Sequence, residues 1–109
     1  MQYRGFTRQA RKVMRIAERL AEKEQQLRMG SEYILAGLLQ ENDGVAGQIL
    51  QQLSVNCEEI LTLIHEISLP KTEEQVADGD FLTPESRAIV EEAYAVAERF
   101  DSELVGTEH

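Results

Sequence analysis

The sequence has very little cysteine and no long apolar run, and both absences narrow the class of protein. Cys57 is the one cysteine among 109 residues, so an internal disulfide framework is excluded and a reducing compartment fits. No segment has the uncharged apolar length of a signal peptide or a membrane span, which predicts a cytoplasmic chain without membrane contact. The pattern G-x-x-x-x-G-K-[ST] is also missing, so this segment is expected to bind no ATP and no other cofactor, and to be no enzyme.

Alternating β-branched residues are scarce too, so no sheet is expected, and the apolar spacing is helical nearly throughout. Five helices are predicted, with apolar stripes over residues 10–21, 34–39, 45–53, 57–67 and 89–100. Breaks are predicted at 42–44 and 54–56, and Pro70 is expected to end the fourth helix. The expected N-terminal caps are Thr7, Ser31, Asn56 and Thr83, the last followed by a proline at the first helical position.

The chain repeats its own beginning 76 positions downstream. Residues 6–21 return as 82–97, and the tetrapeptide G-S-E-Y at 30–33 returns as G-T-E-H at 106–109. A fixed period of this kind predicts pseudo-symmetric units that share one core. The predicted fold is therefore an all-α helical repeat whose second copy is truncated after its first helix. Its expected parts are a four-helix repeat in 1–69, an exposed acidic linker in 70–81 and the start of a second repeat in 82–109.

Positive charge is concentrated at the N-terminal end. Residues 1–28 hold eight Lys or Arg against three acids, a balance of +5, whereas residues 29–109 hold three against seventeen, a balance of −14. This asymmetry indicates a basic contact surface on the first helix. The alternative is a solvated helix face on which Arg15 pairs with Glu18 and Arg19 with Glu22. Nucleic acid is a poor partner, because phosphate is repelled by the acidic remainder.

Three motifs together resemble a known family: F-T-x-x-A-R-K-V from Phe6, G-S-E-Y-I-L-A-G-L-L from Gly30 and E-N-D-G-V-A from Glu41. They are similar to the Clp N-terminal repeat, which forms the N-terminal domain of Clp-family AAA+ protein unfoldases, and they look most like its ClpC type. The doubled occurrence makes the resemblance more specific, and it covers essentially the whole chain. The sequence departs from the family motif at Ser31 and Tyr33, where the family has threonine and histidine.

The resemblance implies a domain of two four-helix repeats in pseudo-twofold arrangement, of which this chain would supply five helices as a piece of a longer protein. It implies that the domain receives adaptor proteins and protein substrates for an ATP-driven ring and its Clp protease, with ATP bound in AAA+ domains outside these residues. For the ClpC type it also implies binding of phosphoarginine, a degradation mark. The positions that match the family's mark-binding residues are Thr7, Glu32, Thr83 and Glu108, and docking is expected at the helix starts around Thr7 with Glu32 and around Thr83 with Glu108. The candidate adaptor contacts are the first-helix cations Arg8, Lys12, Arg15 and Arg19.

These residue types suit phosphoarginine. Free N–H groups and a hydroxyl at a helix start suit the phosphoryl end, and a carboxylate suits the guanidinium. The plain alternative is capping alone. Thr7 and Thr83 are good caps, worth about 1 kcal/mol each. Glu32 and Glu108 occupy first turns, where the helix dipole favours acids.

Two other functions, DNA reading and zinc binding, fit parts of the sequence less well. A helix-turn-helix DNA reader would use residues 35–40 and 45–53, but the second of these segments has no Lys or Arg. A zinc site would need more than Cys57 and His65, which stand eight residues apart without a third ligand at metal spacing. Cys57 is expected to be a buried helix residue, and His109 a helix-start residue.

The apolar stripe of the fifth helix has no partner within a truncated repeat. A domain-exchanged dimer or a concentration-dependent oligomer of the chain is therefore also expected.

Overall fold

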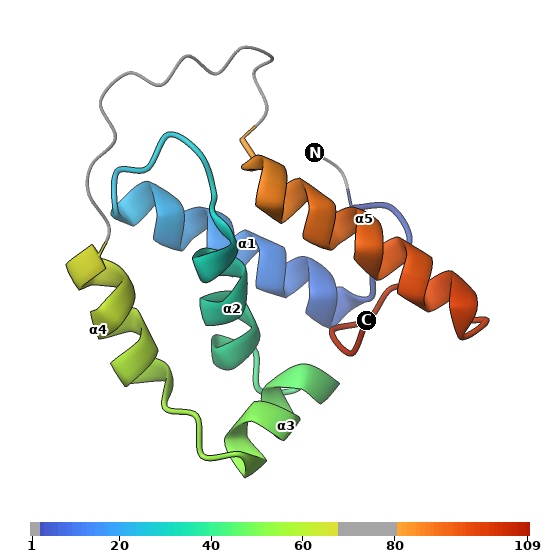
Figure 1. The fold of residues 1–109 in the computed structure, drawn as a ribbon. Helices are drawn as coiled ribbons and strands as arrows, with labels where there is room; N and C mark the ends of the chain where they lie inside the picture. The colour runs from blue at the N-terminus through green and yellow to red at the C-terminus, as the bar shows by residue number, and fades with distance from the viewer. Residues whose placement is uncertain (1–2, 68–80) are drawn as a thin grey trace.

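The computed structural model describes residues 3–67 and 81–109, and over these residues the fold is all-α. The helices are α1 (Arg8–Lys23), α2 (Ser31–Gln40), α3 (Val45–Gln52), α4 (Cys57–Ile67) and α5 (Pro84–Arg99). α2 is central because it packs against each of the other four helices (Figure 1). None of the helices in the described ranges has the length and apolar character needed to cross a bilayer.

The helix starts follow the capping signals, with one correction. The side chains of Thr7 and Thr83 accept the amides of the residues three positions on, each at 3.2 Å, and Asn56 does the same for α4 at 3.2 Å. Ser31 is not the cap of α2: Gly30 is the N-cap and Ser31 is the first helical residue. Gly30 has the extended backbone of a cap, with φ −80° and ψ 166°, and its carbonyl already accepts the amide of Tyr33 at 3.1 Å.

The 76-residue period of the sequence is also a period of backbone geometry. α1 and α5 each contain 16 residues. Each is followed by a left-handed residue, Gln25 with φ 57° and Asp101 with φ 55°. The next amide then donates to Ala21 in one case and to Ala97 in the other, at 3.0 and 2.9 Å. The division into repeats stays a prediction, because the linker expected at 70–81 and the stop expected at Pro70 lie, except for residue 81, outside the described residues.

Two isolated parallel β-bridges connect residues 3–67, here called the first half, with residues 81–109, the second half. The pairing is crosswise, because each bridge joins a residue before a helix start in one half to the segment after the matching helix in the other. Phe6 pairs with Val105, and Leu82 pairs with Met29. The two bridges are equivalent under the 76-residue period. Phe6 corresponds to Leu82 and Met29 corresponds to Val105, so each bridge has the other as its counterpart. The hydrogen bonds are Thr7 N to Val105 O at 2.8 Å, Val105 N to Gly5 O at 2.6 Å, Met29 N to Phe81 O at 2.7 Å and Thr83 N to Met29 O at 3.2 Å. The start of α1 therefore lies against the C-terminal segment, as Figure 1 shows.

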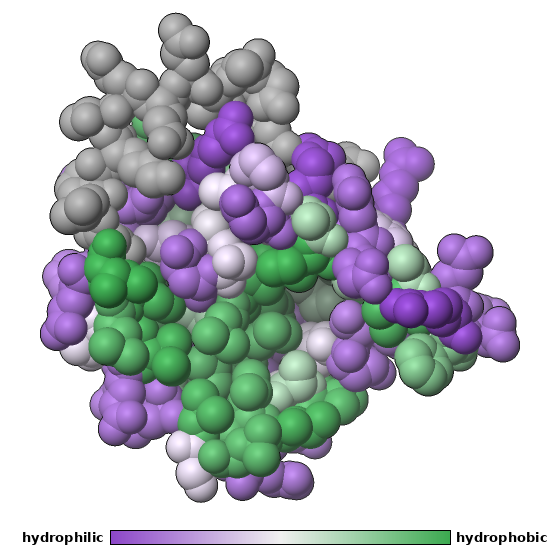
Figure 2. Space-filling view, viewed as in Figure 1, coloured by the Kyte–Doolittle hydropathy of each residue, from purple (hydrophilic) through white to green (hydrophobic). Residues whose placement is uncertain are grey.

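The core is built from the apolar face of α1 and the helices around it. α2 crosses α1 so closely that a Cβ on Gly37 would stand 2.6 Å from the carbonyl oxygen of Val13. Val13 is consequently only 3% exposed, whereas its counterpart on α5, Ile89, is 45% exposed. Phe100, at the end of the α5 stripe, is 74% exposed. A second apolar surface gathers over α2, α3 and α4 (Figure 2).

Candidate functional site

The crosswise bridges decide which candidate residues come together. Thr7 follows the bridge residue Phe6, whose partner Val105 stands three positions before Glu108. In the same way, Thr83 follows the residue that pairs with Met29, three positions before Glu32. The sequence-based grouping by repeat, Thr7 with Glu32 and Thr83 with Glu108, is therefore not the one that the backbone makes. Each threonine lies beside the glycine-led tetrapeptide of the other half.

The Thr7 site has an open helix start. The first backbone hydrogen bond of α1 runs from Arg11 N to Thr7 O at 3.0 Å, so the amides of Arg8 and Gln9 have no acceptor within the helix. The Thr7 hydroxyl oxygen accepts the amide of Ala10, and its own proton has no acceptor in the described part of the chain. Arg8 adds an exposed positive charge next to these donors. The two amides, the hydroxyl and the charge of Arg8 together favour the binding of an anion at this helix start.

The segment opposite Thr7, residues 105–109, is held in its turn by contacts of its own side chains. The carboxylate of Glu108 folds back over Gly106, where a Cβ would collide with it. His109 Nδ1 accepts the Gly106 amide at 2.9 Å, so this nitrogen carries no proton and Nε2–H faces Ser102 Oγ at 3.3 Å. His109 therefore closes a local turn; the sequence-based expectation of a helix-start residue is wrong, because no helix begins at residues 106–109. Glu108 itself stays exposed and available.

The Thr83 site has the same backbone and a different donor set. Pro84 carries no N–H, so α5 offers one amide fewer than α1. The Thr83 hydroxyl donates to Ser86 Oγ at 3.1 Å, and Ser86 Oγ donates to Met29 O at 2.8 Å. The neighbouring Glu85 adds a negative charge instead of a positive one. The Thr83 site is therefore less suited to an anion than the Thr7 site.

Sequence reasoning missed Ser86. Its side chain is fully buried and joins α5 to the segment before α2. The available signal was a serine in an apolar stripe, at the position where the first copy has Ala10. A buried hydroxyl needs a hydrogen-bond partner, so this replacement marks a cross-contact between the halves.

Two more positioning residues, Thr107 and Glu41, surround the start of α3. Thr107 Oγ1 accepts the amide of Ala46 at 3.0 Å and so caps α3 from 61 positions away. Glu41 is 2% exposed; one carboxylate oxygen accepts the amides of Asp43 and Gly44 at 2.7 and 3.1 Å, and the other lies 3.3 Å from Lys12 Nζ. A DNA-reading role for α3 is disfavoured by its side chains, because Val45–Gln52 carries no Lys or Arg for the DNA phosphates.

The basic residues of α1 lie on its solvent side. The pairs expected from sequence, Arg15 with Glu18 and Arg19 with Glu22, are wrong: over residues 3–67 and 81–109 neither arginine has a carboxylate within 4.0 Å. Exposed pairs of this spacing contribute only about 0.3–0.5 kcal/mol, so solvation of the long side chains competes with them. Lys12 is the exception, through its contact with the buried Glu41.

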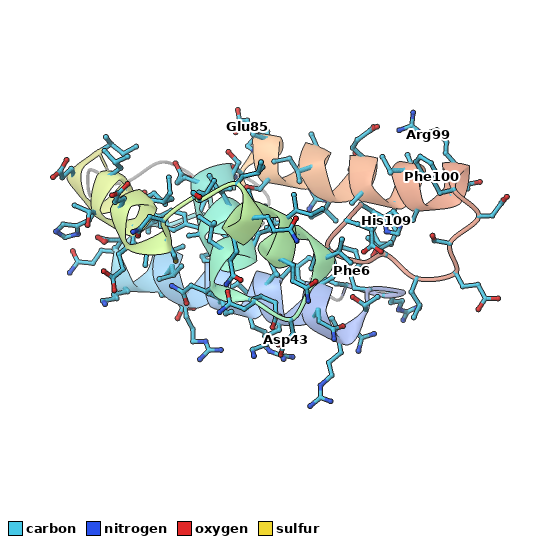
Figure 3. All side chains as sticks on the ribbon, turned by 90° about the horizontal axis from the view of Figure 1, so that it is seen from below. Phe6, Asp43, Glu85, Arg99, Phe100 and His109 are labelled. Atoms are coloured by element: carbon cyan, nitrogen blue, oxygen red, sulfur yellow. The ribbon has the colours of Figure 1, made fainter. Side chains whose placement is uncertain are left out.

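An apolar cavity of about 200 Å³ adjoins the Thr7 site. Its walls come from α1, α2, α5 and residues 105–109. Figure 3 shows Phe6 and His109 between α1 and α5. A ligand held at Thr7 and Glu108 would therefore have an apolar hollow beside it.

The remaining candidate groups are structural. Cys57 is half-buried rather than buried, and both desolvation and the nearby Glu58 raise the pKa of its thiol. His65 Nδ1 lies 2.7 Å from a carboxylate oxygen of Glu24, which ties α4 to the end of α1. Among the residues that the structure describes, no three His, Cys, Asp or Glu side chains are grouped as metal ligands would be.

Comparison with known proteins adds the family. The model of the Clp repeat (R) N-terminal domain matches residues 5–109. Over 109 residues, the chain is 30% identical to the negative regulator of genetic competence ClpC/MecB of Bacillus subtilis and 29% identical to the chaperone protein ClpB of Oceanobacillus iheyensis. It is 29% identical over 107 residues to an ATP-dependent Clp protease ATP-binding subunit ClpA homolog of Porphyra purpurea. These matches cover 98–100% of the chain and 13% of the length of each relative. With its helical fold, its repeated caps and a family match from residue 5 to residue 109, the chain belongs to the Clp repeat N-terminal domain family.

Proposed function

We propose that this chain receives adaptor proteins and protein substrates for an AAA+ unfoldase, and that segments carrying phosphoarginine dock at its two helix starts. The names of the relatives support the first part, since they describe a chaperone and an ATP-binding subunit of a Clp protease. ATP binding and contact with a Clp protease belong in this proposal to parts of a longer protein.

The observation that carries the proposal is the crosswise pairing of the helix starts. Each bridge brings a threonine-capped helix start to the segment that holds a glutamate of the other half. Backbone amides and a hydroxyl can donate to the phosphoryl oxygens, and the carboxylate can accept two hydrogen bonds from the guanidinium. A phosphoarginine carries its phosphoryl group and its guanidinium on one side chain. Hydrogen-bond donors and a carboxylate therefore have to lie within reach of the same side chain.

The two sites are proposed to differ in affinity. Over residues 3–67 and 81–109, the site of Thr7 and Glu108 has two helix-start amides and a hydroxyl proton without acceptors, and it has the charge of Arg8. The site of Thr83 and Glu32 has one amide fewer, an engaged hydroxyl and an acidic neighbour. The first site should therefore bind the mark more tightly.

Isothermal titration calorimetry with a peptide that carries one phosphoarginine, and with its arginine counterpart, tests the proposal. We expect heat only from the phosphorylated peptide. Glu108→Gln should weaken binding about tenfold or more, because a charge-assisted hydrogen bond contributes about 1.5–3 kcal/mol. Glu32→Gln should have the smaller effect, and Glu98→Gln, an exposed acid on α5, should have none. Equal binding of the two peptides would overturn the proposal.

Self-association is a second part of the proposal. The open side of α5, with Ile89 and Phe100 exposed, is expected to produce a domain-exchanged dimer or an oligomer of this chain. Light scattering over a rising concentration series should show an increasing mass. A compact monomer at high concentration would contradict this expectation.

A further inference from the structure

The solvent side of α1 carries a row of four cations, here named the basic row: Arg8, Lys12, Arg15 and Arg19. Their spacing is i, i+4, i+7 and i+11, which at about 100° per residue places them within about 60° of arc. The row is about 16 Å long at about 1.5 Å per residue. It lies opposite the face that holds Val13 and Ala17, which is buried in the core. The row is thus straight, rigid and directed to solvent.

The charge of the basic row is left largely unneutralised by the residues that the structure describes. Within residues 3–67 and 81–109, Arg8, Arg15 and Arg19 have no ion pair, although acids stand three positions after two of them. Lys12 is 52% exposed and holds the buried carboxylate of Glu41 at 3.3 Å. That contact fixes the row against the turn between α2 and α3. Three guanidinium groups remain for an external anion.

A hollow of about 400 Å³ lies along the N-terminal half of the basic row. Arg8, Lys12 and Arg15 line one side of it, and Glu41 and Asp43 line the other. Asp43 belongs to the turn between α2 and α3, so this turn forms the acidic side of the hollow. The acidic side repels an anion, so a negatively charged ligand should follow α1 lengthwise instead of crossing onto that turn.

The shape and the charge select a class of partner. We propose that the basic row binds an acidic helical segment of a partner protein, with carboxylates repeated at the spacing of the row. Such a segment is short enough to meet the row alone, whereas a nucleic acid extends over the acidic remainder, whose balance is −14 over residues 29–109. This proposal rests on the proposed function only in taking the partner to be a protein. The charge and the spacing of the basic row supply the rest.

Fluorescence anisotropy with the full chain tests this inference. The probe is a labelled helical peptide with four glutamates at i, i+4, i+7 and i+11, and its control has glutamine at those positions. The glutamate peptide should bind, should be displaced by added salt, and should be bound about tenfold more weakly by Arg15→Gln/Arg19→Gln. The matched variant Gln51→Glu/Gln52→Glu changes the net charge equally on an exposed part of α3 and should leave binding nearly unchanged. Equal binding of the two peptides, or equal weakening by the two variants, would overturn the inference.

Two further measurements separate the alternatives. An oligonucleotide of the same charge should bind more weakly than the glutamate peptide, and tighter binding would overturn the assignment of a protein partner. Arg15→Gln/Arg19→Gln should keep its heat of binding for the phosphoarginine peptide, because both residues lie two turns or more from Thr7. Failure of the basic row and failure of the helix-start sites are therefore distinguishable.

Discussion

α1 and α5 are built alike and covered differently. Both start at a threonine cap, contain 16 residues and end in a left-handed turn residue. Both are joined through a neighbouring backbone bridge to the other half. However, Val13 is 3% exposed and its counterpart Ile89 is 45% exposed, because α2 lies across α1 and no helix among the described residues lies across α5 in the same way.

This difference shows that helix ends and helix burial are determined by different parts of the sequence. Helix starts and ends depend on residues within a few positions, so two related segments form the same helix in different surroundings. Burial depends on what packs against the helix. The same contrast applies to the two candidate sites, whose backbones agree and whose donors differ through single residues such as Arg8 against Pro84.

The largest expected effect comes from placing a charge on the covered face and on the open one. Val13→Asp should lower the free energy of unfolding by about 3–5 kcal/mol, because it buries an unpaired carboxylate. Ile89→Asp should cost less than about 1 kcal/mol, because the side chain can reach water. Urea unfolding followed by circular dichroism measures both. Equal costs would mean that the two faces are equally covered in solution.

The next effect concerns the close crossing of α2 over α1. Gly37→Ala should destabilise the fold by about 1–3 kcal/mol, because the new methyl group would meet the backbone of Val13. The expected cost is a net effect, because Gly→Ala in an uncrowded helix would by itself gain about 1 kcal/mol of helix propensity. Urea unfolding again provides the measurement. An unchanged midpoint for Gly37→Ala would show that the crossing is looser than described.

The two caps should contribute nearly equally. Thr7→Ala and Thr83→Ala should each cost about 1 kcal/mol, because each removes one acceptor from the first turn of a helix. Thermal unfolding of the two variants side by side checks this. A cost at one cap and none at the other would break the equivalence of α1 and α5.

The smallest effect tests the one polar difference inside the matched helices. Ser86→Ala should cost about 0.5–1.5 kcal/mol, since it removes the hydrogen bond to the Met29 carbonyl. The reverse change, Ala10→Ser, should be tolerated within about 1 kcal/mol, because a hydroxyl there would stand in the matching position near Val105. Calorimetry of both variants gives the comparison. A severe loss in Ala10→Ser would show that the two positions are not equivalent.

Much of the fold was predictable from the sequence because its signals are local. The caps at Thr7, Asn56 and Thr83, the break at 42–44 and the proline at the start of α5 all act over three or four residues. Ser31 was misassigned by one position because the cap of α2 is Gly30, which has no side-chain oxygen to mark it in the sequence.

The sequence does not reveal which of the candidate residues lie near one another. Thr7 and Glu32 stand closer in sequence, but the two bridges bring the start of α1 to Val105 and the start of α5 to Met29. The cap that Thr107 provides for α3 spans 61 positions, and no local pattern encodes such a contact. The carboxylate of Glu41 is likewise buried only because the turn after it folds back over its oxygens.

Hydrogen exchange measured by NMR tests the crosswise pairing most directly. The amides of Thr7, Met29, Thr83 and Val105 donate across the two bridges, although all four lie outside the helices. They should exchange slowly and be protected together, because each bridge needs both segments in place. Exchange of these four amides at the rate of an unstructured chain, with the helices still protected, would contradict the crosswise pairing on which both candidate sites depend.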